Sequence, residues 1–139
     1  MMVSIVQDYQ NIDNQRQFTL ENRTGKQIVA DRRLIEQLIS NLLSNAIKYS
    51  SPDSEIIISL STEKKKVKFV VKDHGLGMDK ETVQRIFDKF FQAPTDHRDG
   101  LGLGLYLVKG IVEAHQGSIQ VLSEPGVGSR FEVTLPSVN

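Results

Sequence analysis

The sequence contains no cysteine, and this absence excludes a disulfide framework, a thiolate zinc site and a cysteine nucleophile. It also has no surplus of either charge, because 17 Lys and Arg residues balance 17 Asp and Glu residues. A balanced charge gives no reason to expect nucleic acid or an anionic membrane surface as a partner. The lack of cysteine is compatible with a reducing compartment.

Long hydrophobic runs are missing too. No apolar stretch is long enough to span a bilayer, and no signal-peptide pattern opens the chain. The length of 139 residues suits a single domain with a hydrophobic core, and no repeat divides it. We therefore expect one domain over 1–139, soluble or a soluble piece of a larger protein, with 1–4 as a linker remnant.

The spacing of apolar residues predicts helical and extended segments in alternation. Neighbouring strands in pairs favour a mixed, mostly antiparallel sheet covered on one face by helices, an α+β two-layer sandwich. The first two strands are expected to form a hairpin turned at 22–25. The predicted helices cover about 3–15, 32–49, 79–91 and 103–115, and the predicted strands about 17–21, 26–29, 56–61, 67–72, 118–123 and 130–135.

The helix predicted over 32–49 organises the chain. Asp31 is its expected N-cap, and apolar residues recur along it at the spacing of one buried face. Asn41, Asn45 and Lys48 stand at i, i+4 and i+7, on one stripe beside that face. Two amides and an ammonium group so aligned can serve a hydrated metal ion and a phosphate. The alternative is an ordinary solvated polar edge.

A first glycine cluster, 73–78, directly follows a predicted strand. The carboxylate of Asp73 can accept a hydrogen bond from a donor such as an exocyclic amine. Gly75 and Gly77 would let a flat ring approach the backbone closely. The alternative is a plain Asp-x-Gly turn.

A second glycine cluster, 100–105, runs straight into a predicted helix. Its glycines free backbone N–H groups to face an anion, and the helix dipole adds to the attraction. No Gly-Lys-Ser/Thr follows, so it is not a Walker loop, and it does not follow a strand as a Rossmann fingerprint requires. The alternative is a flexible hinge.

Together, these motifs resemble the ATP-binding domain of bacterial sensor histidine kinases (HATPase_c), in the Bergerat-fold, or GHKL, superfamily. The resemblance covers roughly 5–136. In family terms the N box is 41–49, the G1 box 73–77, the F box 86–91 and the G2 box 100–105. It implies ATP and Mg²⁺ as cofactors.

The resemblance also implies a role for each matching residue. Asn45 would bind Mg²⁺, and Asn41 would help to hold the metal or the phosphates. Lys48 would contact phosphate and Tyr49 would pack on the nucleoside. Asp73 would accept the adenine amino group. The remaining cofactor-binding residues are glycines of the base pocket and residues of a lid over the phosphates: Gly75, Gly77, Gly100, Gly102, Leu103 and Gly104.

Other residues are expected to be structural. Phe87 and Phe90 match the F box, but their helical spacing favours core packing. His74 is expected at the pocket edge and His115 as a helix-terminal histidine without a further role. The lid, 92–101, is expected to be mobile without nucleotide.

Residue 41 bears on the reaction. Hydrolytic members of the superfamily carry Glu here to activate water, whereas Asn41 has no useful basicity. Phosphoryl transfer to a supplied nucleophile is therefore favoured. No histidine of this chain lies in a His-Glu-x-x-x-Pro motif, so no catalytic residue is assigned and the dimerisation and phosphoacceptor domain is expected elsewhere.

The resemblance thus predicts a cytoplasmic catalytic domain of a two-component sensor kinase, monomeric in isolation and unable to autophosphorylate alone. Its expected partners are the phosphoacceptor domain of the parent kinase and, downstream, a response regulator. Neither nucleic acid nor membrane insertion is expected. Two alternatives stay open at this point. One is a stand-alone ATPase or nucleotide-gated binding module, and the other is a docking module that no longer binds nucleotide.

Overall fold

The computed structural model describes residues 17–22, 31–51, 53–89, 91 and 104–137. Within these ranges, no helix is both long enough and apolar enough to cross a membrane. The described elements, in chain order, are β1 (Gln17–Asn22), α2 (Arg32–Lys48), β2 (Glu55–Glu63), β3 (Lys66–Asp73), α3 (Lys80–Arg85), α4 (Gly104–Ala114), β4 (Ser118–Glu124) and β5 (Gly128–Pro136).

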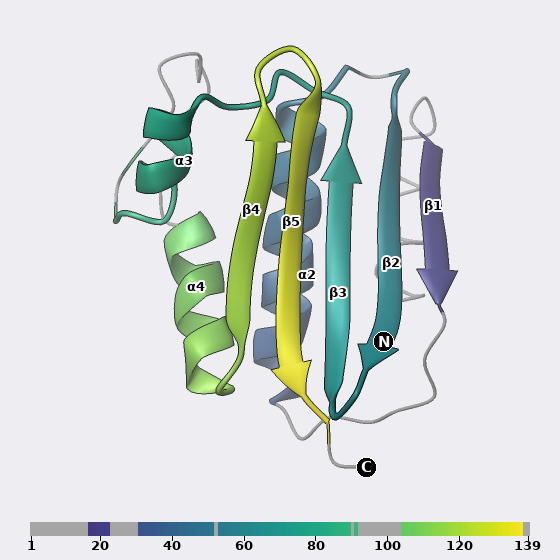
Figure 1. Ribbon diagram of the computed structural model, residues 1–139, viewed down its shortest axis with the longest axis vertical. Helices are drawn as coiled ribbons and strands as arrows, with labels where there is room; N and C mark the ends of the chain where they lie inside the picture. The colour runs from purple at the N-terminus through teal and green to yellow at the C-terminus, as the bar shows by residue number, and fades with distance from the viewer. Residues whose placement is uncertain (1–16, 23–30, 52, 90, 92–103, 138–139) are drawn as a thin grey trace.

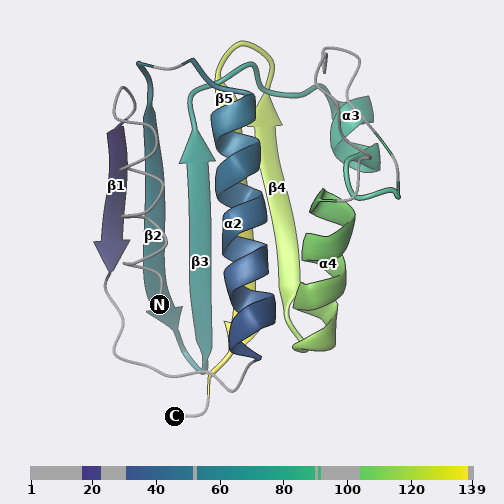
Figure 2. The ribbon, with the colours of Figure 1, turned by 180° about the vertical axis from the view of Figure 1, so that it is seen from behind.

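The strands form one sheet in the order β1-β2-β3-β5-β4 (Figure 1). Only β1 and β2 pair in parallel, and the other three neighbouring pairs are antiparallel. Helices α2 and α4 lie on the same face of this sheet (Figure 2). The predicted mixed sheet with helices on one face is therefore confirmed.

Helix α2 provides most of the helical side of the core. The carboxylate of Asp31 caps it, because Oδ1 accepts hydrogen bonds from the N–H groups of Arg33 and Leu34 at 3.0 and 3.4 Å. Its apolar face packs on the inward side chains of the central strands, as the periodicity predicts. The most deeply buried members of this core are Leu38, Ile39, Leu42, Leu43, Ile56, Ile58, Val71, Val108, Val112, Phe131 and Val133.

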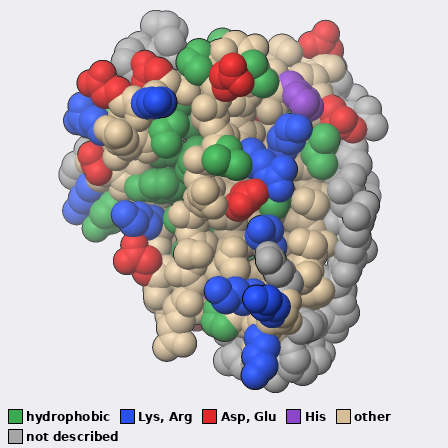
Figure 3. All heavy atoms as spheres, in the orientation of Figure 1, with side chains coloured by type: hydrophobic (Ala, Val, Ile, Leu, Met, Phe, Trp, Pro, Cys, Tyr) green, Lys and Arg blue, Asp and Glu red, His purple; other side chains and the backbone are tan. Residues whose placement is uncertain are grey.

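The other face of the sheet carries charged side chains between apolar ones (Figure 3). Glu132 lies between two cations, with its carboxylate 2.7 Å from Arg130 Nε and 4.0 Å from Lys68 Nζ. Val70, which lies on β3 opposite Glu132, is only 5 % exposed. Long charged side chains therefore shield part of this open face, and their apolar stems contribute more than the ion pairs themselves.

One predicted element differs from the structure, and another is not tested by it. The helix expected over 79–91 spans only α3, because the N–H groups of Asp88 and Phe91 bond three residues back, to the carbonyl oxygens of Arg85 and Asp88. A turn with i→i−3 hydrogen bonds contains about three residues, close to the 3.6 residues of an α-helical turn. The apolar spacing therefore resembles that of a helix, and Ile86 is still buried in the core. The first strand, β1, pairs in parallel with β2. The hairpin expected between the first two strands is not tested, because its second strand lies outside the described residues. The segments expected over 3–15, 26–29 and 92–101 lie outside the described residues.

Asp79 caps α3 at the exit of the first glycine cluster. Its Oδ1 accepts a hydrogen bond from the N–H of Thr82 at 2.8 Å. This bond, together with one to the Thr82 side chain, lowers the pKa of Asp79 below its usual 3.8. Because the folded pKa is depressed, the stabilisation is present above the unfolded value and is lost as pH falls through the folded one.

His115 does more than end a helix, which corrects the sequence-based interpretation. Its Nδ1 lies 2.8 Å from the carbonyl oxygen of Ile111, and its Nε2 accepts the N–H of Asp31 at 3.2 Å. This arrangement requires the neutral tautomer with the proton on Nδ1. The ring therefore joins the last turn of α4 to the first turn of α2.

We predict that His115→Ala lowers the free energy of unfolding by about 0.5–1.5 kcal/mol, the net contribution of a hydrogen bond, because the Asp31 N–H loses its acceptor in the protein. Urea unfolding measures the change. His74→Ala serves as the control, since His74 is exposed, and should change stability by less than about 0.5 kcal/mol. Equal stability of both variants would show that the bridge between the helices contributes nothing.

Candidate functional site

The predicted polar groups gather at one end of the sheet. The C-terminal end of α2, the end of β3 and the turn between β4 and β5 all lie at the upper edge in Figures 1 and 2. The stripe on α2 is thus brought next to the loop that follows Asp73. The two segments are in direct contact, because the Leu76 N–H donates a hydrogen bond to the carbonyl oxygen of Tyr49 at 3.0 Å.

Asp73 is the buried acidic group of this edge, with 4 % of its surface exposed. Its Oδ1 accepts hydrogen bonds from the N–H groups of Gly75 at 2.9 Å and Ser129 at 3.3 Å. A buried carboxylate is costly unless hydrogen-bonded, and these two donors offset that cost. They also fix the direction of the carboxylate, as recognition of a specific donor requires.

Gly75 and Gly77 are needed for the packing of the loop itself. A Cβ on Gly75 would lie 2.0 Å from the carbonyl oxygen of Tyr49, and one on Gly77 would lie 1.9 Å from that of Glu124. Gly77 also has a φ of 69°, which residues with a Cβ rarely adopt. The structure therefore supplies a reason for both glycines beyond the close approach of a flat ring.

Asn41 carries an unusual feature. Its side chain is half-buried, and its Nδ2 is shielded from solvent yet has no hydrogen-bond partner among the residues that the structure describes. An unpaired buried donor costs about 1–3 kcal/mol, and a ligand oxygen that accepts its hydrogen bond can remove this cost. A half-turn of the amide would present its oxygen instead. Asn45, one helical turn further on, is also half-buried.

Lys48 and Tyr49 end this stripe. The Lys48 ammonium lies 5.3 Å from the centre of the Tyr49 ring, a distance at which the two attract. Both side chains are half-buried, and the positive charge falls at the last turn of α2, where the helix dipole favours it. A cation held here can face an anion bound at the edge.

The residues present fit a magnesium-bound nucleotide, although the described side chains alone offer no metal cage. No group of three or more His, Asp and Glu side chains that could hold an ion occurs among the described residues. A hard cation at this edge would use amide oxygens, water and phosphate oxygens, the set that Mg²⁺ often takes. The unpaired Asn41 amide and the Lys48 charge suit such a ligand.

Some predicted site residues have other surroundings, and others lie outside the described residues. Gly104 is exposed at the start of α4, with open space where a Cβ would stand. Phe87 packs against the core, as expected for a structural role, and His74 is exposed beside Asp73. The remaining predicted residues, Phe90, Gly100, Gly102 and Leu103, lie outside the described residues.

Sequence reasoning missed Ser129 and Ser123. Ser129 is buried at the start of β5 and donates its N–H to Asp73, and its hydroxyl lies 2.8 Å from that of Ser123 on β4. The sequence marks the turn before Ser129 through Gly126 and Gly128, which signals a strand start. It does not show that β5 pairs with β3, which places Ser129 opposite Asp73.

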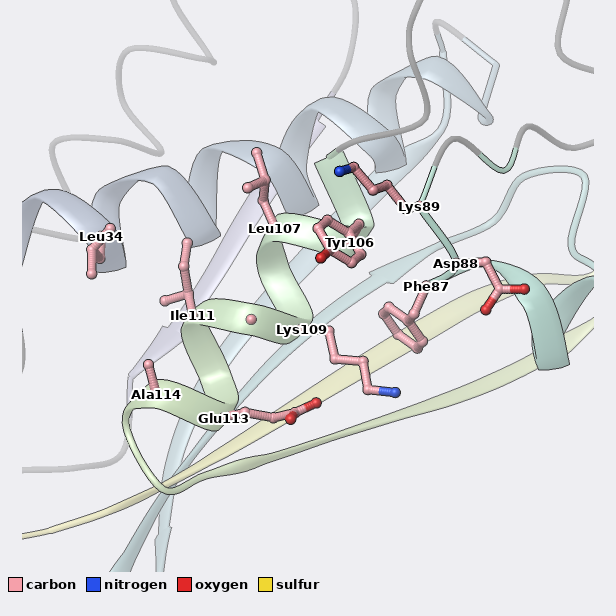
Figure 4. A pocket seen from close by; sticks show the side chains of 11 residues that line it. Leu34, Phe87, Asp88, Lys89, Tyr106, Leu107, Lys109, Ile111, Glu113 and Ala114 are labelled. Atoms are coloured by element: carbon pink, nitrogen blue, oxygen red, sulfur yellow. The ribbon is translucent and has the colours of Figure 1, made fainter.

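A separate hollow of about 750 Å³ lies along α4 (Figure 4). None of the polar groups described above lines it, so it is distinct from the candidate site. Two lysines flank its aromatic rings, with Lys89 Nζ 5.8 Å from the Tyr106 ring and Lys109 Nζ 5.9 Å from the Phe87 ring. The lining residues are Leu34, Phe87, Asp88, Lys89, Tyr106, Leu107, Lys109, Gly110, Ile111, Glu113 and Ala114.

Residues 30–139 match the family described as histidine kinase-, DNA gyrase B- and HSP90-like ATPase. The sensor protein CiaH of Streptococcus pneumoniae is 38% identical over 126 residues, which is 88% of this chain and 28% of CiaH. The adaptive-response sensory kinase SasA of Crocosphaera subtropica is 45% identical over 111 residues, 78% of this chain and 29% of SasA. The chain thus spans less than a third of the length of these relatives.

Solved structures agree on the fold. The mycobacterial sensor histidine kinase MprB superposes with a TM-score of 0.85 at 23% identity, covering 98% of this chain and 94% of that one. Full-length ShkA in complex with AMPPNP gives 0.82 at 24% identity, covering 99% of this chain and 30% of ShkA. The catalytic domain of histidine kinase ThkA gives 0.79 at 26% identity over 96% of this chain and 90% of that one.

We predict that Gly75→Ala lowers the free energy of unfolding by about 2–4 kcal/mol, because its Cβ would collide with the backbone of Tyr49. Thermal unfolding measures the change. Gly110→Ala is the matched control, since nothing lies within 4 Å of its Cβ position in α4. That variant should gain about 0.5–1 kcal/mol from helix propensity. A Gly75→Ala protein as stable as the wild type would disprove the tight packing of the loop.

Proposed function

Because the chain belongs to the histidine kinase-, DNA gyrase B- and HSP90-like ATPase family, we propose that it binds Mg-ATP and supplies the γ-phosphoryl group to a histidine on a separate dimerisation and phosphoacceptor domain. One observation carries this proposal. The buried, backbone-anchored Asp73 carboxylate shares an edge with the half-buried amides and ammonium of α2.

In this proposal, Asp73 accepts the adenine amino group through its oriented carboxylate. Lys48 offsets phosphate charge, and Tyr49 packs on the nucleoside. Asn41 and Asn45 hold the metal or the phosphates, and the unpaired Nδ2 of Asn41 supports that assignment. The glycines of the second cluster close over the phosphates. Bound Mg²⁺ would neutralise phosphate charge.

The residues favour transfer to a histidine over attack by water. Asn41 occupies the position from which a Glu would activate water, and an amide has no useful basicity. A phosphoryl transfer depends mainly on positioning and on charge stabilisation, which the described groups can supply.

The acceptor is then expected in another domain. Both ring nitrogens of His115 are engaged in hydrogen bonds, and neither His74 nor His97 lies in a phosphoacceptor motif. The short span of this chain relative to the curated sensor kinases also supports a parent protein with further domains. We further propose a response regulator as its downstream partner and a cytoplasmic location.

Calorimetric titration with ATP, with and without Mg²⁺, tests the binding role. We expect Asp73→Asn to weaken ATP binding by about 10- to 150-fold, the effect of losing a hydrogen bond to a charged group. Asn45→Ala should weaken binding only when Mg²⁺ is present. Asp53→Asn, which changes an exposed carboxylate, is the control and should bind as the wild type does.

Each outcome decides between the alternatives. A wild-type chain that binds no ATP would contradict the proposal and leave a docking module. Steady phosphate release that disappears in Asp73→Asn would instead favour a stand-alone ATPase.

The phosphoacceptor domain needs a surface on which to dock, and we propose the exposed side of α4 for this role. Tyr106 and Leu107 are 42 % and 39 % exposed on the first turns of this helix, which begins at Gly104 of the second glycine cluster. They line the hollow of Figure 4 together with Phe87. An exposed apolar surface on α4, which begins in the second glycine cluster, suits a domain that must present its histidine to the phosphates.

We predict that Leu107→Glu in the parent kinase lowers the autophosphorylation rate about tenfold, because a charge would be buried on docking. ATP affinity of the isolated chain should stay unchanged. Leu122→Glu is the control, since Leu122 is 51 % exposed on β4 and points away from the helices. Equal rates for the two variants would argue against docking on α4.

A further inference from the structure

Ser123, on the inner side of β4, makes three hydrogen-bond contacts with one hydroxyl. Its Oγ accepts the N–H of Met78 at 2.8 Å, donates to the carbonyl oxygen of Gly128 at 3.1 Å and lies 2.8 Å from Ser129 Oγ. When Ser123 donates to Gly128, the Ser129 hydroxyl must donate to Ser123. The Ser123 oxygen then accepts two hydrogen bonds and donates one.

These contacts connect both ends of the loop after β3. Asp73 stands at the start of the loop and receives the N–H of Ser129 through its Oδ1. Met78 stands at the end and donates its N–H to Ser123. The pair of serine hydroxyls joins the two ends, so the path Asp73, Ser129, Ser123, Met78 closes a ring around the loop.

The backbone of the loop lies against the same β4–β5 turn. Gly126 donates its N–H to the carbonyl oxygen of Leu76 at 2.7 Å. A Cβ on Gly128 would lie 2.1 Å from the carbonyl oxygen of Asp73. Because the backbones are in such close contact, a small shift of the β4–β5 turn must also move the loop after β3. The hydroxyl pair of Ser123 and Ser129 resists this shift.

We propose that Ser123 is a positioning residue for base recognition: through Ser129 and Met78 it holds the Asp73 carboxylate and its loop in the geometry that selects an adenine ring. This inference deepens the proposed function and rests on it. Ser123 acts through other residues. Its loss should therefore reduce the base-dependent part of binding and spare the part that depends on phosphate and metal.

The test compares the affinities for ATP and GTP by competition against a fluorescent nucleoside triphosphate analogue, in Mg²⁺. We expect Ser123→Ala to lower the affinity for ATP about five- to tenfold, as loss of one hydrogen bond does, and that for GTP by less than about twofold. The ATP-to-GTP affinity ratio therefore falls. Ser123→Thr keeps the hydroxyl and should restore the ratio.

Ser118→Ala is the matched control, because Ser118 is exposed at the other end of the same strand, and it should leave both affinities unchanged. Ser129→Ala is a second variant that removes the partner hydroxyl but keeps the N–H that donates to Asp73. It too should lower the ratio, which keeps the test decisive if Ser123→Ala does not fold.

The results separate this inference from the proposed function. If the wild type binds ATP but the ratio is unchanged in Ser123→Ala, or in Ser129→Ala where the first variant is unfolded, the positioning role is overturned and ATP binding stands. Equal losses for ATP and GTP would also overturn it, since they indicate general destabilisation. If the wild type binds neither nucleotide, the proposed function fails first.

Discussion

The hydrogen bond from the Leu76 N–H to the Tyr49 carbonyl oxygen joins the two polar parts of the molecule. It ties the C-terminal end of α2 to the loop after β3, at a distance that leaves no room for a Cβ on Gly75. Through this contact the stripe of Asn41, Asn45 and Lys48 comes to the same edge as the Asp73 carboxylate. A nucleotide with a base at one end and phosphates at the other needs such a pair of regions.

Two features of this edge lower the stability of the folded chain. A carboxylate is kept buried by two backbone donors, and an amide donor on α2 has no partner in the part of the chain that the structure describes. Both raise the free energy of the isolated folded chain, and a ligand that supplies hydrogen-bond partners can offset this. Violations of this kind concentrate at functional sites, where they prepare groups for a ligand.

The two sides of helix α4 have different surroundings. Val108, Ile111 and Val112 are buried and attach the helix to the core, while Tyr106 and Leu107 stay exposed beside the hollow. His115 then ties the far end of the same helix to the start of α2. The helix is thereby anchored at its C-terminal end, whereas its N-terminal end, which begins in the second glycine cluster, leaves apolar side chains exposed.

The sequence by itself determined what depends on local order: the α2 period, the Asp31 cap, the strand alternation and the motifs that resemble histidine kinase ATPase domains. It misjudged the end of α3, because tight turns and a helix give similar apolar spacing. Only the tertiary structure decided that β5 lies between β3 and β4 and that β1 pairs in parallel with β2. It alone placed Ser129 against Asp73, Ser123 against Met78 and His115 against Asp31. These contacts join residues far apart in the chain through single hydrogen bonds, and no period or spacing in a sequence encodes such pairing.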